Sequence, residues 1–121
     1  MRHSFMLVPL ALVSFVAVGC QRSEPVAQSM MHQVLGALQI PSRTERDPAL
    51  ATACRECAIA GDAESVLLGI PRIEDQTLRD EVLQDCVAMF VAANKTEVAR
   101  KLVELITDPA TRDAALRTLP G

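Results

Sequence analysis

The cysteines are the residues of this chain whose type and spacing could do chemistry. Cys54 and Cys57 form a C-x-x-C pair, a spacing used by thiol redox motifs and by zinc sites, and Cys86 lies farther along the chain. The pair is expected about two turns into a helix, away from the helix N-terminus that lowers the pKa of a reactive thiol. A zinc ion would need a fourth ligand, for which His32, in another helix, is the one histidine after Cys20. A thiol-dependent function, redox or metal-binding, is therefore our alternative prediction, and we expect no metal site.

No second set of catalytic residues accompanies the thiols. The sequence contains no G-x-S-x-G, no H-E-x-x-H and no glycine-rich phosphate loop, and His32 alone is expected to be an exposed helix residue. The adjacent acidic pairs Glu74-Asp75 and Asp80-Glu81 are expected to be solvated groups near helix ends. We therefore predict that the protein is not an enzyme and uses no cofactor.

The composition excludes two further classes of function. The chain has a net charge of −3 and no basic cluster after Cys20, so it lacks the electrostatic footprint of a nucleic-acid-binding protein. It contains no Trp or Tyr, and Phe90 is its one aromatic residue after Cys20. Surfaces that stack bases are therefore not expected. The core must be built from Leu, Val, Ile, Ala and Met, which pack well between helices.

The start of the chain, from Met1 to Cys20, forms a recognisable targeting pattern. Met1-Arg2-His3 is a short basic head, Phe5 to Val18 is an almost unbroken apolar run, and small residues precede Cys20. This is the pattern of a secretory signal peptide, whose apolar run is too short to span a bilayer comfortably. Its ending resembles the lipobox of bacterial lipoproteins, in which the signal peptide is cut before a cysteine that then carries the lipid. The resemblance implies a signal peptide over residues 1–19, acyl chains such as palmitate on Cys20, and a lipid-anchored place in the cell envelope.

The segment that follows Cys20 is polar and leads into a single domain. An Asp directly after Cys20 would resemble the inner-membrane retention signal of proteobacterial lipoproteins. Gln21 stands there instead, so the resemblance implies the periplasmic face of the outer membrane if the cell has two membranes. Residues 20–28 are interpreted as the lipidated cysteine and a tether, in which Pro25 disfavours helix. Residues 29–121 are enough for one small domain, which we predict to be a helical-repeat domain.

After the tether, the sequence repeats without a gap, and its period of about 33 residues is typical of stacked helical hairpins. The clearest marker is an Arg-Asp dipeptide that occurs three times at this spacing, and apolar and turn residues follow the same shift. The matching sets are Arg46-Asp47, Arg79-Asp80 and Arg112-Asp113; Leu50, Leu83 and Leu116; Ile40, Ile73 and Ile106; and Gly61 and Asn94.

Apolar periodicity and capping signals divide the repeat into helices. Asp47-Pro48 and Asp108-Pro109 each predict an N-cap followed by proline at the first helical position. Gly61 and Asn94 predict turns between helices, and Pro71 predicts that the third helix kinks or stops. The expected helices span 29–40, 47–60, 62–74, 76–93, 95–107 and 109–118, and no strand is expected.

Helix–turn–helix units of this length, with Gly or Asn in the turn and an apolar stripe on the second helix, resemble tetratricopeptide repeats (TPR). The resemblance covers most of residues 29–119, although Leu50 and Leu83 stand where that family commonly has a large ring. It implies an all-α fold, a short α-solenoid of about three TPR-like hairpins that offers a concave face to a protein partner. A plain helical bundle is the alternative fold.

The repeat also suggests a structural interpretation of the cysteines. The 33-residue shift places Cys86 on Ala53, so Cys86 is expected at nearly the height of Cys54 on the neighbouring helix. A Cys54–Cys86 disulfide would link the two repeats, provided that both side chains point at the shared seam. Three cysteines after Cys20 leave one thiol unpaired, so simple core packing of the thiols stays open.

The same shift predicts a surface for a partner. If Leu50, Ala53 and Cys57 face the core, the outward positions of their helix and of its equivalent one repeat later are small or partly apolar. These outward positions are Ala51, Arg55, Ala58, Gln84, Ala88 and Val91. Packing of these residues under a neighbouring helix is the alternative. We therefore predict a membrane-anchored protein-binding or scaffold module, whose partner is an unknown protein or another copy of the chain.

Overall fold

The structure of the protein is a computed structural model that describes residues 26–121. The predicted signal peptide, the lipid attachment at Cys20 and most of the predicted tether lie outside these residues. The described residues form helices and no strand: α2 (Val26–Leu38), α3 (Arg43–Ile59), α4 (Ala63–Gly69), the short 3-10 helix η2 (Ile70–Arg72), α5 (Gln76–Ala92), α6 (Thr96–Leu105) and α7 (Pro109–Leu116). The prediction of an all-α fold is confirmed. No described helix has both the length and the apolar character needed to cross a membrane.

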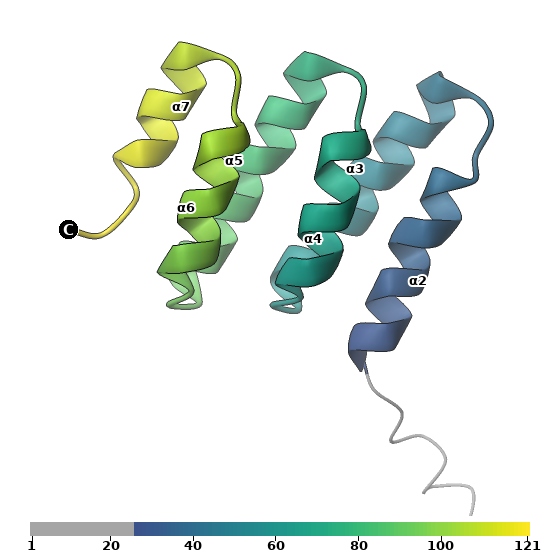
Figure 1. The fold of residues 1–121 in the computed structure, drawn as a ribbon, viewed down its shortest axis with the longest axis horizontal. Coiled ribbons are helices and arrows are strands. Elements are labelled where there is room, and N and C mark those ends of the chain that lie inside the picture. Colours follow the sequence, from purple (N-terminus) through teal and green to yellow (C-terminus); the bar gives the residue numbers. More distant parts are fainter. Residues whose placement is uncertain (1–25) are drawn as a thin grey trace, which may run out of the picture.

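The helices lie in two layers that run across the molecule. Figure 1 shows α2, α4 and α6 side by side in one layer and α3, α5 and α7 in the other. The chain passes from one layer to the other at every connection, so that α3 packs against α2 and α4 and also against α5 in its own layer. Helix α5 packs in turn against α3, α6 and α7, which makes α3 and α5 the central helices.

Helix boundaries recur at the spacing of the sequence repeat. Helices α3, α5 and α7 begin at Arg43, Gln76 and Pro109, so their starts are spaced as evenly as the three Arg-Asp dipeptides. The turns that follow α3 and α5 contain Gly61 and Asn94, with φ of 79° and 64° respectively. Both residues therefore occupy the left-handed region in which glycine is unstrained and asparagine is tolerated. The two predicted turns are confirmed.

Two helix starts differ from their predictions. Helix α2 begins at Val26, so residues 26–28 of the predicted tether are helical. Helix α3 begins at Arg43, so Pro48 lies inside the helix and Asp47 is not its N-cap. Asp47 is buried instead and accepts hydrogen bonds from the backbone N–H groups of Glu74 and Asp75, at 3.2 and 2.9 Å. These partners lie far along the sequence, which is why a local capping pattern gave the wrong start.

Two other predicted helix boundaries are confirmed. The Asp108 side chain accepts a hydrogen bond from the backbone N–H of Thr111, and Pro109 is the first residue of α7. Hydrogen bonds from Thr111 lower the pKa of the exposed Asp108 carboxyl. Helix α4 ends at Gly69, and Pro71 lies in the 3-10 turn that follows. Proline has no N–H to continue an α-helix, which accounts for the short α4.

The core is made of aliphatic side chains around one aromatic ring. Phe90 is fully buried, and the largest side chains packed with it include Leu50, Leu83, Ile70 and Ile73. Leu50 and Leu83 are equivalent in the repeat and both are completely buried, whereas their third equivalent, Leu116, is 47% exposed. The apolar pattern therefore describes the interior of the molecule well and its C-terminal end less well.

Candidate functional site

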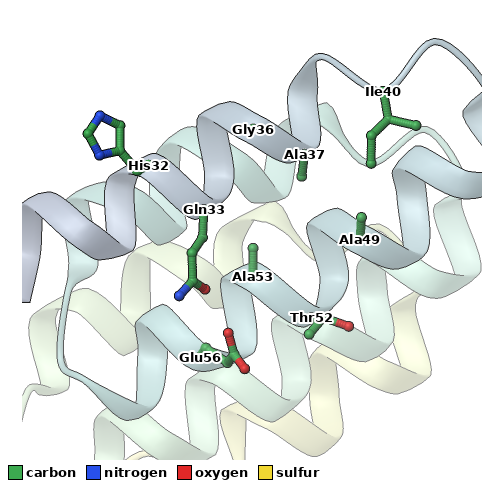
Figure 2. Close-up of a pocket in the computed structure, with 9 residues that line it drawn as sticks. All are labelled: His32, Gln33, Gly36, Ala37, Ile40, Ala49, Thr52, Ala53 and Glu56. Carbon is green, nitrogen blue, oxygen red and sulfur yellow. The ribbon is translucent and has the colours of Figure 1, made fainter.

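A groove between α2 and α3 opens at the end of the molecule that α2 forms. Figure 2 shows its two walls, and the hollow has a volume of about 460 Å³. Its floor is formed by small or aliphatic side chains that are buried or half-buried: Ala37, Ile40, Ala49 and Ala53. The remaining lining residues are His32, Gln33, Gly36, Thr52 and Glu56. The result is an apolar floor between two polar walls, a common composition for a binding surface.

The space beside Gly36 shows that the groove is open. A Cβ atom built on Gly36 would meet no described atom within 4 Å. Gly69, which lies one repeat later in α4, has the opposite surroundings: a Cβ atom there would lie 2.7 Å from Cys54 Sγ and 3.0 Å from Val34 Cγ1. Gly69 therefore lets α4 approach α2 and α3 closely. Among residues 26–121, the same helix face is covered at Gly69 and has no cover at Gly36.

Three of the polar residues that line the groove lie at one of its ends. Gln33 extends from α2 toward α3, where Glu56 lies opposite it, and His32 stands at the outer edge of α2 (Figure 2). All three side chains belong to exposed residues. Hydrogen-bond donors thus lie on the α2 wall and a carboxylate acceptor lies on the α3 wall.

The predicted partner face is only partly exposed. Ala51 and Ala58 are each 3% exposed, because α5 packs along α3 over this side. Arg55 is half-buried and its guanidinium pairs with Asp85 at 2.9 Å. Ala51 and Ala58 are therefore packing positions, whereas Arg55 remains partly accessible.

The equivalent positions on α5 are more exposed to solvent than those on α3. Gln84 and Ala88 are exposed and Val91 is half-buried. The reason is the length of α7, which ends at Leu116, the equivalent of Leu83, and so reaches along only the first half of α5. The second half of α5 is left without the helix that covers α3 at Ala51 and Ala58.

The three thiols lie in the core rather than in the groove. Cys54, Cys57 and Cys86 are buried and free, so the Cys54–Cys86 disulfide stays a prediction. Burial raises the pKa of the Cys54 thiol to about 12, and the neighbouring Cys86 and Cys57 add to this rise. Burial followed by the charge of Asp85 raises the pKa of Cys86 to about 12, against the opposite influence of Arg55. Burial also raises the pKa of Cys57. Such thiols stay protonated at neutral pH, and the thiolate is the reactive form.

The repeated Arg-Asp dipeptides have a structural role that the sequence did not reveal. Arg46, Arg79 and Arg112 each donate to the carbonyl six residues earlier, on Ile40, Ile73 and Ile106. Asp80 repeats what Asp47 does one repeat before: it accepts from the N–H groups of Thr107 and Asp108 and from the Thr107 hydroxyl. Each arginine therefore ties its own helix to the segment that precedes it, and the first two aspartates, Asp47 and Asp80, also fix the segments that lead into α5 and α7.

Among the residues that the structure describes, no group of three or more His, Cys, Asp or Glu side chains could hold a metal ion. His32 lies at the groove and the thiols lie in the core, so the C-x-x-C and the one described histidine are not brought together. Comparisons with models of known protein families, with curated protein sequences and with solved structures found no match to this chain.

Proposed function

We propose that this protein is a lipid-anchored binding module, in which a short TPR-like α-solenoid is held at a membrane through Cys20 and docks a protein partner. The anchor is supported by the basic head, apolar run and small residues that precede Cys20. The solenoid is supported by helix starts at Arg43, Gln76 and Pro109, which follow the period of the sequence repeat.

The observation that carries the binding function is the open groove between α2 and α3. In a stack of helical hairpins, each unit buries its face against the next. The face around Gly69 is buried in this way, while the equivalent face around Gly36 has an apolar floor and no described neighbour. An uncovered apolar face bordered by polar residues is typical of a surface that another protein covers.

A thiol-dependent function has less support from the geometry. The three thiols are buried, and the pKa values of Cys54 and Cys86 lie far above neutral. Neither the groove nor its polar residues include a thiol. We therefore assign the protein a binding role rather than a catalytic one.

The groove is tested by cross-linking in membranes that contain the lipidated full chain. A photoreactive amino acid replaces Gly36 in one sample and Lys101, an exposed residue on α6, in the other. We expect a defined product from position 36 and none from position 101. Thr52→Arg, on the opposite wall, should remove the product from position 36. Equal labelling from both positions, or none from either, would contradict the proposal.

The anchor is tested separately with Cys20→Ser. The wild-type protein should fractionate with membranes and carry the mass of its lipid. The variant should remain an uncleaved precursor or become soluble, because it has no thiol to acylate. An unchanged mass and unchanged membrane association of the variant would rule out this anchor. Fractionation of inner from outer membranes then tests the expected location.

A further inference from the structure

The polar residues on the two walls of the open groove are complementary to each other. Its α2 wall carries the donors His32 and Gln33, and its α3 wall carries the acceptor Glu56 at the same end of the groove. Helices α2 and α3 run in opposite directions along the floor. A body with a donor on one wall and an acceptor on the other, at one height, can pair with a rotated copy of itself.

We propose that the occupant of the groove is a second copy of this chain, docked groove to groove about a two-fold axis parallel to α2 and α3. This inference rests on the proposed function, since it names the partner of the same groove. Such an axis preserves height along the helices and exchanges the two walls, so α2 of each copy lies on α3 of the other. Gln33 of each copy, which extends into the groove, then meets Glu56 of its partner, which gives two equivalent polar contacts.

The floor of the groove permits the close approach that this arrangement needs. Helices in contact lie about 8–10 Å apart, at the short end where the side chains between them are small. Gly36, Ala37, Ala49 and Ala53 provide such a surface. The contact around Gly69 shows that helices of this chain pack against a glycine of this face.

The opposite end of the molecule argues against the other way of pairing copies, which is head to tail. Within the chain, the Gly69 face is covered by α2, through Val34, while Met31 Sδ accepts a hydrogen bond from Ser65. Two repeats later, the equivalents of Met31 and Val34 are Glu97 and Arg100, an exposed ion pair at 3.0 Å. Placing this pair on the apolar floor of the groove would remove both charges from water, which is unfavourable. Charged outer surfaces are typical of the closing unit of a helical array.

The inference is tested by the mass of the intact lipidated chain in detergent, measured by sedimentation over a concentration series. We expect a reversible dimer. Gly36→Arg should raise its dissociation constant by at least about tenfold, because the arginine fills the floor. Leu35→Arg is the matched control on the same helix: Leu35 is 41% exposed and does not line the groove, so this variant should dimerise as the wild type does. A monomer at every concentration, or a dimer that survives Gly36→Arg, would overturn the proposal.

A charge exchange distinguishes this two-fold pairing from any other contact through the groove. Glu56→Lys should weaken the dimer, because the lysine would face the amide donor of Gln33 of the partner in place of a carboxylate acceptor. Adding Gln33→Glu to Glu56→Lys restores a donor and an acceptor on opposite walls and should restore dimerisation. Failure of this rescue would overturn the two-fold arrangement.

The cross-linked product from position 36 separates the two proposals. A product with twice the mass of the chain supports both. A product that joins the chain to a different protein would sustain the binding function and overturn self-association. The absence of any product would overturn both.

Discussion

Gly36 and Gly69 occupy equivalent positions in two successive repeats, yet they lie in opposite surroundings. Around Gly69, α4 is covered by Val34 of α2 and Cys54 of α3. Around Gly36, none of the residues that the structure describes covers the corresponding face of α2, which forms one side of the groove. The difference does not come from the two glycines. It comes from the described helices that lie against each one, so the covered face at Gly69 shows how the face at Gly36 could pack.

The largest expected effect contrasts an interior position with its equivalent at the C-terminal end. Leu83→Glu should lower the free energy of unfolding by about 3–5 kcal/mol, because Leu83 is fully buried and the new carboxylate would have no partner. Leu116→Glu should change it by less than about 0.5 kcal/mol, since Leu116 is 47% exposed. Urea unfolding of both variants measures the contrast, and a mild effect at Leu83 would show that the helix register is wrong.

The next effect concerns the Arg-Asp dipeptides. Asp80→Ala should cost at least about 2 kcal/mol, because it leaves the N–H groups of Thr107 and Asp108 and the Thr107 hydroxyl without their acceptor. Asp113→Ala is the matched control, since Asp113 is the exposed equivalent at the end of the array. Its effect should stay within about 0.5 kcal/mol. Equal losses from both variants in thermal unfolding would mean that Asp80 does not link α5 to α7.

The buried thiols make the stability of the interior depend on pH. Burial raises the pKa of Cys54 and Cys86 from 9.0 to about 12, so each folded thiol keeps a proton that the unfolded chain releases. The contribution of each protonated thiol to the stability of the fold is therefore fully present below pH 9 and is lost as the pH rises toward 12. At pH 10 the loss should be about 1–2 kcal/mol for each thiol.

Unfolding measured between pH 7 and 11 tests this dependence. Cys86→Ala should reduce the slope of the free energy of unfolding against pH. Alanine should be tolerated there, because Ala53 occupies the equivalent position in the preceding repeat. A profile that is unchanged by this substitution would mean that Cys86 ionises as readily in the folded protein as in the unfolded one.

The smallest expected effect, at Gly36, belongs to the most direct comparison, which is between the two glycines themselves. Gly36→Ala should stabilise the monomer by about 0.5–1 kcal/mol, because alanine is the better helix residue and its Cβ has free space. Gly69→Ala should instead destabilise it by about 1–3 kcal/mol, since Cys54 and Val34 must move. Thermal unfolding at low protein concentration measures both. Changes of the same sign would contradict the difference between the covered and uncovered faces.

Local signals predicted much of the fold. The turns at Gly61 and Asn94, the N-cap at Asp108 and the end of α4 before Pro71 each depend on residues that are adjacent in sequence. The start of α3 was predicted wrongly, because Asp47 binds the backbone of residues 27 and 28 positions later rather than its own helix. Capping rules describe neighbours in sequence and do not include such partners.

The site was less predictable than the fold for the same reason. The helix periodicity placed Ala51 and Ala58 together with Gln84 and Ala88, but only the second pair is exposed. Which of them is covered depends on the length of the helix alongside, and α5 is longer than α7. The groove at Gly36 was missed because a glycine carries no apolar signal. Its equivalence to Gly69 was nevertheless present in the repeat.

The Asp47 and Asp80 carboxylates also determine how the molecule comes apart. Each one holds backbone amides at the start of the next long helix, so those amides exchange with solvent only when two adjacent helices separate. Fraying of α5 alone would leave the amides of Glu74 and Asp75 protected. Loss of α3 would expose them and release the segment that leads into α5. The chain should therefore unzip from its ends, one unit at a time, with each departing helix loosening the next.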